Sequence, residues 1–440
     1  MDKNHNFIDL LSKIFSNELI LSKIFSYLSL RDLSICREVC YKWQIEAKRV
    51  IVNRSESLNI FHFFRTDDSI DGLNSGEKSQ TTDEDLTYCS YWFDKYDFES
   101  NAIKSMNKSL KSIPEICLLV YGSFGEDVKL KQRLYQTEVV RRSLPDNDCR
   151  IVNLNSQCLI GFPTTSDVPV EKISHFDDLA AVSMLLFPKY RSDSKITVFS
   201  GSDMRQKIFN LNDIKAIVIF TTSSIFQDNR NLYLEINSLS KYITQKLDNR
   251  IAFGGYNSAY FSFNKTDFLN YTDRQPFPVS DGSPDGCPLE AHELIGLCFS
   301  GPELRASSLN VNTKEKERIV EKLIEFKNRL DFNPLSNRFQ ETIVFMFTDE
   351  EKSDAFAKLE AFQMVFPGCR VYGISGYGQY GYDYWPAIDV RDSTDLKTKS
   401  FSSFVTNNKK PSNRNRIKRR IVLNTNMTTF VVIKVPKKFF

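Results

Sequence analysis

The sequence NELILSKIFSYLSLRDLSICREVCYKW, residues 17–43, decides the fold of the N-terminal part of this 440-residue chain. Apolar residues recur there at three- and four-residue steps, which predicts a helix with a broad apolar stripe. The stripe consists of Ile20, Leu21, Ile24, Phe25 and Leu28. A second apolar set continues this period over two further short helices and comprises Leu30, Leu33, Ile35, Val39, Cys40 and Trp43. A unit of roughly 40 residues lies at the limit of independent stability, so we expect part of this surface to close against another chain.

The same residues resemble an F-box, which commonly ends in a Val-Cys pair followed three residues later by Trp. The likeness is carried by Leu28, Leu33, Val39, Cys40 and Trp43, whereas Ser16 and Asn17 replace the common Leu-Pro start. The resemblance implies docking to the SKP adaptor, and through it to the cullin scaffold of an SCF ubiquitin ligase. The adaptor-binding residues that it implies are Leu19, Ile20, Ile24, Phe25, Leu28, Leu33, Val39, Cys40 and Trp43. The alternative is an ordinary helical cap on the following domain.

Composition describes a soluble globular chain, with 41% hydrophobic and 26% charged residues. A net charge of +3 gives no argument for nucleic-acid binding. No stretch reaches the length of an apolar membrane span, and the start MDKNHN lacks the apolar core of a signal peptide. Nine scattered cysteines without a CxxC pair suit a reducing compartment. We therefore expect a cytoplasmic or nuclear protein that has no membrane partner.

Three domains are predicted: an F-box at 10–55 and two α/β regions at 56–255 and 256–440. Residues 58–64, LNIFHFF, favour the first strand of the body. The polar, acidic stretch 66–87 that follows predicts a flexible loop.

A strand-helix-strand pattern occurs three times in the body, which predicts α/β layering with parallel strand pairs. The first unit has CLLVY at 117–121, a helix over 127–142 and CRIVNLN at 149–155. The second has AIVIF at 216–220, a helix over 232–247 and IAFGGY at 251–256. The third has TIVFMF at 342–347, a helix over 354–366 and CRVYGISGYG at 369–378. Strands near 196–200, 294–301 and 428–435 add antiparallel character, and a helix is expected over 313–330.

The body resembles the FIST domain, an α/β sensory domain. The stretches that carry this likeness are IAFGGY at 251–256, LIGLCFSG at 294–301, FPGCRVYGISGYGQYG at 366–381 and the last strand after Thr428. Residues 348–352 depart from the small turn that the family tends to carry there. Together the two resemblances predict a small three-helix F-box followed by a large mixed α/β FIST-like body.

Glycines at 376, 378 and 381 spell GxGxxG after a predicted strand. A dinucleotide site would need a helix to begin there, whereas the following residues indicate a strand or turn. Tight turns are one alternative. A ligand cleft at the strand ends is the other, lined by Gly254, Gly255, Tyr256, Gly376, Tyr377 and Gly378, because FIST domains are thought to bind small ligands.

The sequence contains no GxSxG, HExxH, P-loop or kinase signature, and no cofactor is expected. Cys36 and Cys40 are one helical turn apart, but core packing explains them better than a metal. The basic stretch 409–420 is a candidate nuclear import signal, a patch for an acidic partner or a solvated loop. The import signal would use Lys409, Lys410, Lys418, Arg419 and Arg420.

We therefore predict a non-catalytic substrate-recognition subunit of an SCF-type ligase, whose body binds an unknown target protein for ubiquitination and degradation. The alternative is a ligand-sensing FIST protein in which the F-box serves assembly or localisation. A third hypothesis, that the protein is an oxidoreductase, is supported by the GxGxxG motif alone.

Overall fold

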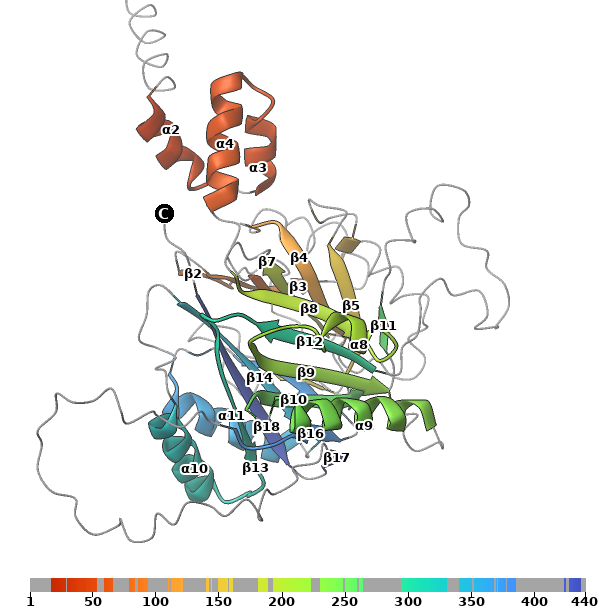
Figure 1. The fold of residues 1–440 in the computed structure, drawn as a ribbon. Helices are drawn as coiled ribbons and strands as arrows, with labels where there is room; N and C mark the ends of the chain where they lie inside the picture. The colour runs from red at the N-terminus through yellow and green to blue at the C-terminus, as the bar shows by residue number, and fades with distance from the viewer. Residues whose placement is uncertain are drawn as a thin grey trace, which may run out of the picture.

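The computed structural model describes residues 17–28, 30–53, 59–65, 79–83, 86–93, 110, 112–121, 140–141, 144, 149–156, 158–160, 181–188, 193–222, 230–247, 250–258, 261–263, 294–330, 340–349, 352–367, 369, 371–376, 378–384, 423–424 and 427–436. Within these residues, a small N-terminal helical region precedes a mixed α/β body that contains three sheets (Figure 1). The predicted fold class is confirmed in this form, as a small helical region followed by a mixed α/β body, whereas the likeness of the body to the FIST domain stays a prediction.

The helical unit, as we call the N-terminal region, consists of α2 (Glu18–Phe25), α3 (Leu30–Cys36) and α4 (Tyr41–Asn53). It lies at one end of the molecule, beyond the sheets of the body (Figure 1). The predicted boundaries, 10–55, extend past the described helices on both sides.

All three predicted strand-helix-strand units have parallel strands. β4 (Pro114–Tyr121) pairs with β5 (Arg150–Asn155), β9 (Ile214–Thr222) with β10 (Ala252–Ser258), and β14 (Gln340–Thr348) with β15 (Val371–Ser375). The crossover helices of the second and third units are α9 (Arg230–Gln245) and α11 (Lys352–Val365). Most of the helix predicted over 127–142 lies outside the described residues.

Each parallel pair belongs to a different sheet. The sheets have the orders β11-β5-β4-β7-β1-β3-β2, β17-β16-β10-β9-β12-β8 and β13-β18-β14-β15-β6. The first holds β1 (Asn59–Arg65), β2 (Ser79–Asp83), β3 (Leu86–Phe93), β7 (Ala181–Pro188) and β11 (Phe261–Phe263). The second holds β8 (Lys195–Ser200), β12 (Leu294–Ser300), β16 (Gln379–Gly381) and β17 (Leu423–Asn424). The third holds β6 (Cys158–Ile160), β13 (Arg305–Val311) and β18 (Thr428–Pro436).

The sheets do not follow the predicted division of the body at residues 255 and 256, which falls inside β10. β6 joins a sheet whose other strands all come from the second half of the chain, because it pairs with β15. The loop predicted over 66–87 also needs correction, since β2 and the start of β3 lie within it. The two strands form an antiparallel ladder from Ser79↔Ser90 to Asp83↔Leu86, and backbone pairing makes a strand of the polar sequence SQTTD.

Alternate residues of the central strands face two different cores, as the period of a strand requires. On β4, Leu118 and Val120 enter a core shared by all three sheets, whereas Cys117 and Leu119 enter a cluster that includes buried residues of the helical unit. The outer face of the six-stranded sheet packs against α9 (Figure 1). Two further helices are α8 (Met204–Lys207) and α10 (Lys316–Arg329), and α10 confirms the helix predicted over 313–330. No helix in the described part of the chain combines the length and the apolar character needed to cross a membrane.

Candidate functional site

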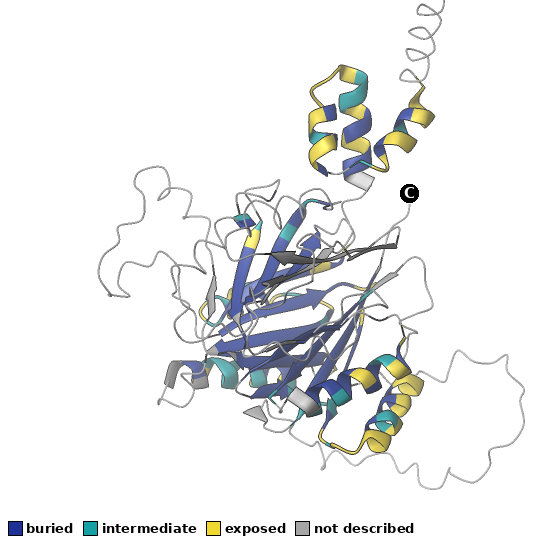
Figure 2. Ribbon diagram, turned by 180° about the vertical axis from the view of Figure 1, so that it is seen from behind, coloured by how far each residue is buried: buried dark blue, intermediate teal, exposed yellow. Residues whose placement is uncertain are grey.

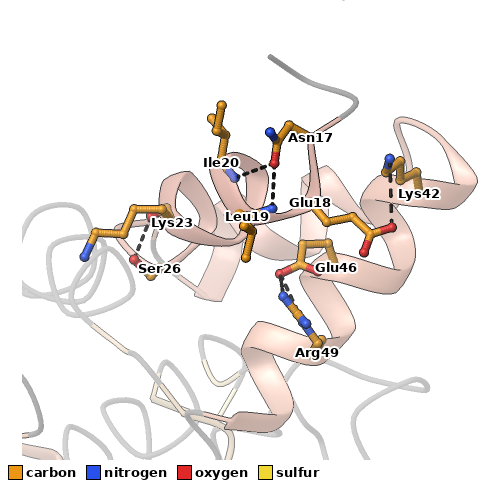
Figure 3. Close-up of polar contacts among 9 residues, drawn as sticks. All are labelled: Asn17, Glu18, Leu19, Ile20, Lys23, Ser26, Lys42, Glu46 and Arg49. Carbon is orange, nitrogen blue, oxygen red and sulfur yellow. Dashed lines mark hydrogen bonds and ion pairs between the residues drawn. The ribbon is translucent and has the colours of Figure 1, made fainter. Parts of the chain in front are cut away.

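Helix α2 begins at a side-chain cap. The Asn17 side-chain oxygen accepts hydrogen bonds from the backbone N–H groups of Leu19, at 3.0 Å, and Ile20, at 3.4 Å (Figure 3). Such a cap satisfies donors that have no partner inside the helix and typically stabilises it by about 1 kcal/mol. The position where the usual F-box start is missing therefore still starts a helix.

Aromatic and charged contacts join the three helices. The rings of Phe25 on α2 and Trp43 on α4 meet edge to face with centroids 5.3 Å apart. Lys42 Nζ lies 3.9 Å from a Glu18 carboxylate oxygen, which links the starts of α4 and α2 (Figure 3). That exposed ion pair contributes at most about 1 kcal/mol. Apolar packing is therefore the main interaction that holds the helices together.

The outer surface of the helical unit is unusually apolar. Much of the unit is exposed (Figure 2), and it contributes eight of the eleven exposed large apolar side chains among the described residues. We call these eight the apolar surface: Leu19, Ile20, Ile24, Tyr27, Ile35, Val39, Tyr41 and Ile45. Leu19 is 80% exposed and Tyr41 78%, values at which burial by a partner would remove most of a side chain from water. Concentration of apolar exposure on one small unit is typical of a protein interaction site.

The structure divides the nine residues that the sequence implicates in adaptor binding. Exposed members are Leu19, Ile20, Ile24, Val39 and Cys40. Leu28 and Trp43 are half-buried and pack on the core of the unit, whereas Phe25 and Leu33 are buried within it. Direct contact with a partner thus stays a prediction for the exposed members, and the buried ones can act only by supporting the surface.

Three exposed residues escaped the sequence argument altogether: Tyr27, Tyr41 and Ile45. Tyr41 and Ile45 are one helical turn apart on α4, a spacing that could have revealed them. Lys23 Nζ lies 5.3 Å from the centre of the Tyr27 ring, so a cation sits beside this part of the apolar surface.

The predicted ligand cleft maps to a junction of the three parallel units. Ser375, Gly376 and Gly378 of the cleft region each form a hydrogen bond to a residue near the carboxyl end of a strand in one of the three units. Ser156 Oγ donates to the Ser375 carbonyl at 2.7 Å. The Gly376 N–H donates to the Thr348 carbonyl at 3.0 Å, and the Asn257 N–H donates to the Gly378 carbonyl at 2.9 Å. The two halves of the predicted cleft are therefore neighbours.

Protein atoms fill the space beside Gly254, Gly255 and Gly376. A Cβ at Gly255 would collide with the Ile219 carbonyl oxygen, and one at Gly376 with the Asn257 carbonyl oxygen. Tyr256 is fully buried, with its ring stacked on Phe347. Close packing of strands is thus a sufficient reason for the glycines, and the cleft stays a prediction; Tyr377 lies outside the described residues.

Two buried side-chain amides at this junction have an NH₂ group that meets no acceptor among the residues that the structure describes. Thr221 Oγ1 donates to Asn257 Oδ1 at 3.0 Å, and Thr429 Oγ1 contacts Gln379 Oε1. Within the described part of the chain, neither Asn257 Nδ2 nor Gln379 Nε2 has a hydrogen-bond partner. Buried donors of this kind carry a desolvation cost of about 1–3 kcal/mol.

The GxGxxG glycines continue into strand β16 rather than a helix, as the sequence indicated. Gly378 has φ +131°, which suits a glycine turn. Among the residues that the structure describes, no three His, Cys, Asp or Glu side chains gather in a group able to hold a metal. The basic segment 409–420 lies outside the described residues.

Comparison with known proteins finds one family similar to the helical unit. The family model described as F-box-like matches residues 18–49, which covers α2, α3 and most of α4. The curated proteins give no match to the chain.

An F-box-like domain implies binding to the SKP adaptor within SCF complexes, and F-box proteins are typically non-catalytic receptors. The apolar surface lies on the matched helices. Residues 18–49 are thus similar to the F-box-like family, and this similarity supports the general role of an SCF substrate adaptor.

Proposed function

We propose that this chain is the substrate-recognition subunit of an SCF ubiquitin ligase. The observation that carries the proposal is the apolar surface, because eight of the eleven exposed large apolar side chains gather on the F-box-like helices. The SKP adaptor would cover this surface and connect the chain to the cullin scaffold. The chain itself would supply no catalytic group.

The α/β body is the proposed receptor for a target protein. Its three parallel units support the resemblance to the FIST domain, and the order of an F-box followed by such a body resembles F-box only protein 22. Holding the target near the conjugating enzyme would raise the local concentration of its lysines and promote ubiquitination and proteasomal degradation. We place this activity in the cytoplasm, the nucleus or both, with 409–420 as the candidate import signal.

The test is co-purification with the SKP adaptor. Substitutions Ile24→Asp and Val39→Asp put charges on the apolar surface without removing a core side chain, since both positions are exposed. We expect the double variant to lose adaptor binding by at least about a hundredfold, because two charges would be buried without partners. The matched control is Ile324→Asp, which charges an exposed apolar position on α10 instead. A folded double variant that binds like the control would contradict the proposal.

Ligand sensing is the second candidate function. It is favoured by the amide NH₂ groups of Asn257 and Gln379, which lie beside the predicted cleft residues and have no partner among the described residues. A thermal-shift screen of metabolites and nucleotides, including NAD and FAD, tests it. Stabilisation that disappears in Asn257→Leu would support ligand sensing. If no compound stabilises the protein, ligand sensing is contradicted and the adaptor function is the remaining candidate.

A further inference from the structure

We propose that Leu110 is a positioning residue, through which the body holds the F-box-like helices in one fixed orientation. Only the consequence for ubiquitin transfer rests on the function proposed above. The contact itself follows from the hydrogen bonding and packing between the helical unit and the body.

The first part of the argument is a hydrogen bond at the start of α3. Leu30 is the first residue of this helix, and its N–H donates to the Leu110 carbonyl at 3.1 Å. The first amides of a helix have no acceptor within it. Here the body supplies the acceptor, from a residue 80 positions further along the chain. The start of α3 is therefore completed by the body.

The second part is apolar packing around the same contact. Leu30 is 2% exposed and Leu110 1%, so both side chains are removed from water. They belong to one hydrophobic cluster with Val50 and Ile51 of α4 and with Leu119 of β4. Burial of this kind resists hinge motion, because any rotation of the helices would expose apolar side chains.

The third part is that the body contact and the apolar surface use different residues. None of the eight residues of the apolar surface belongs to the cluster that contains Leu110. A partner can therefore cover the apolar surface while the body contact stays in place. The adaptor, the helical unit and the body would then form one rigid assembly, in which a bound target keeps a constant position relative to the adaptor.

The test measures the distance between the helices and the body in the full chain. Fluorophores are attached through unnatural amino acids at Lys48 on α4 and Lys241 on α9, which are both exposed. We expect one narrow distance distribution in the wild type and in Leu110→Met, and a broad one in Leu110→Asp. The matched control, Leu309→Ala, removes an equally buried leucine from β13, which carries neither label, and should keep the distribution narrow. A broad wild-type distribution would overturn the proposal whatever the variants do.

Hydrogen exchange provides a second measurement with a milder variant. Leu110→Ala keeps the carbonyl but removes packing, so amides of α3 should exchange at least about tenfold faster while those of β9 are unchanged. Equal acceleration in α3 and β9 would indicate global destabilisation and contradict a local positioning role.

Repeating the distance measurement with the SKP adaptor separates the two proposals. If the distance distribution is narrow and the adaptor does not bind, the positioning role is supported and the ligase function is contradicted. If the adaptor binds and the distribution is broad, the ligase function is supported and the positioning role is contradicted.

Discussion

At the scale of single residues, cysteines report on the proposed interface. Cys40 is exposed at the start of α4, whereas Cys298 is buried in β12. Burial raises the pKa of the Cys298 thiol to about 12, which leaves almost no reactive thiolate near neutral pH. We expect iodoacetamide at pH 8 to modify Cys40 at least about tenfold faster than Cys298, and the SKP adaptor to slow the reaction of Cys40. Peptide mass spectrometry measures each site, and an unchanged Cys40 rate would place that residue outside the adaptor contact.

The residues of α2 also define what the sequence could predict at this scale. Ile24 and Phe25 are adjacent members of one apolar stripe, yet Ile24 is 37% exposed and Phe25 1%. The apolar period predicts a helix with a wide apolar face, but it does not say which part of that face meets Trp43 and which part meets a partner. That choice depends on contacts between helices, which periodicity does not encode.

At the scale of elements, the close approach of β9 and β10 requires Gly255. A methyl group there would collide with the Ile219 carbonyl oxygen, a backbone atom held in the strand ladder. We expect Gly255→Ala to lower the free energy of unfolding by about 2–3 kcal/mol, the cost of overpacking. Gly201→Ala is the control, because its methyl group would meet the carboxylate end of the Glu235 side chain, which can move more easily. Urea unfolding measures both, and equal losses would show that the backbone contact has no special cost.

The elements also differ in how well the sequence predicted them. Strands β9 and β14 are long apolar runs followed by helices, so their parallel units could be predicted locally. β2 could not, because SQTTD has no apolar alternation and becomes a strand only by pairing with β3. Likewise, the pairing of β6 with β15 joins segments about 200 residues apart, and no local pattern specifies such a partner.

At the scale of the whole molecule, one buried tyrosine connects two sheets. Tyr372 lies on β15, and the single hydrogen of its hydroxyl is shared between two acceptors, the carbonyl oxygens of Leu118, at 3.3 Å, and Ser183, at 3.2 Å. These acceptors belong to β4 and β7 of the seven-stranded sheet. The shared core and this hydroxyl therefore hold the body together across the boundary that the sequence placed at residue 255.

This connection predicts a pH-dependent stability. Burial raises the pKa of Tyr372 well above its ordinary value of 10.0, so folding favours the neutral phenol. Its contribution is complete below the unfolded pKa of about 10 and is lost as the pH rises toward the folded value. We expect Tyr372→Phe to lower the free energy of unfolding by about 1–2 kcal/mol at pH 7, the net worth of the hydrogen bonding. Above about pH 10 this difference in the free energy of unfolding should shrink by about 1.4 kcal/mol per pH unit. The reason is that the wild type releases the phenol proton of Tyr372 when it unfolds, whereas Tyr372→Phe has no such proton. Burial also raises the pKa of Tyr380, but this residue is present in both proteins, so its effect cancels in the difference between them. Urea unfolding between pH 7 and pH 11 measures the difference, and a gap that stays constant with pH would mean that the hydroxyl does not stabilise the neutral, folded form.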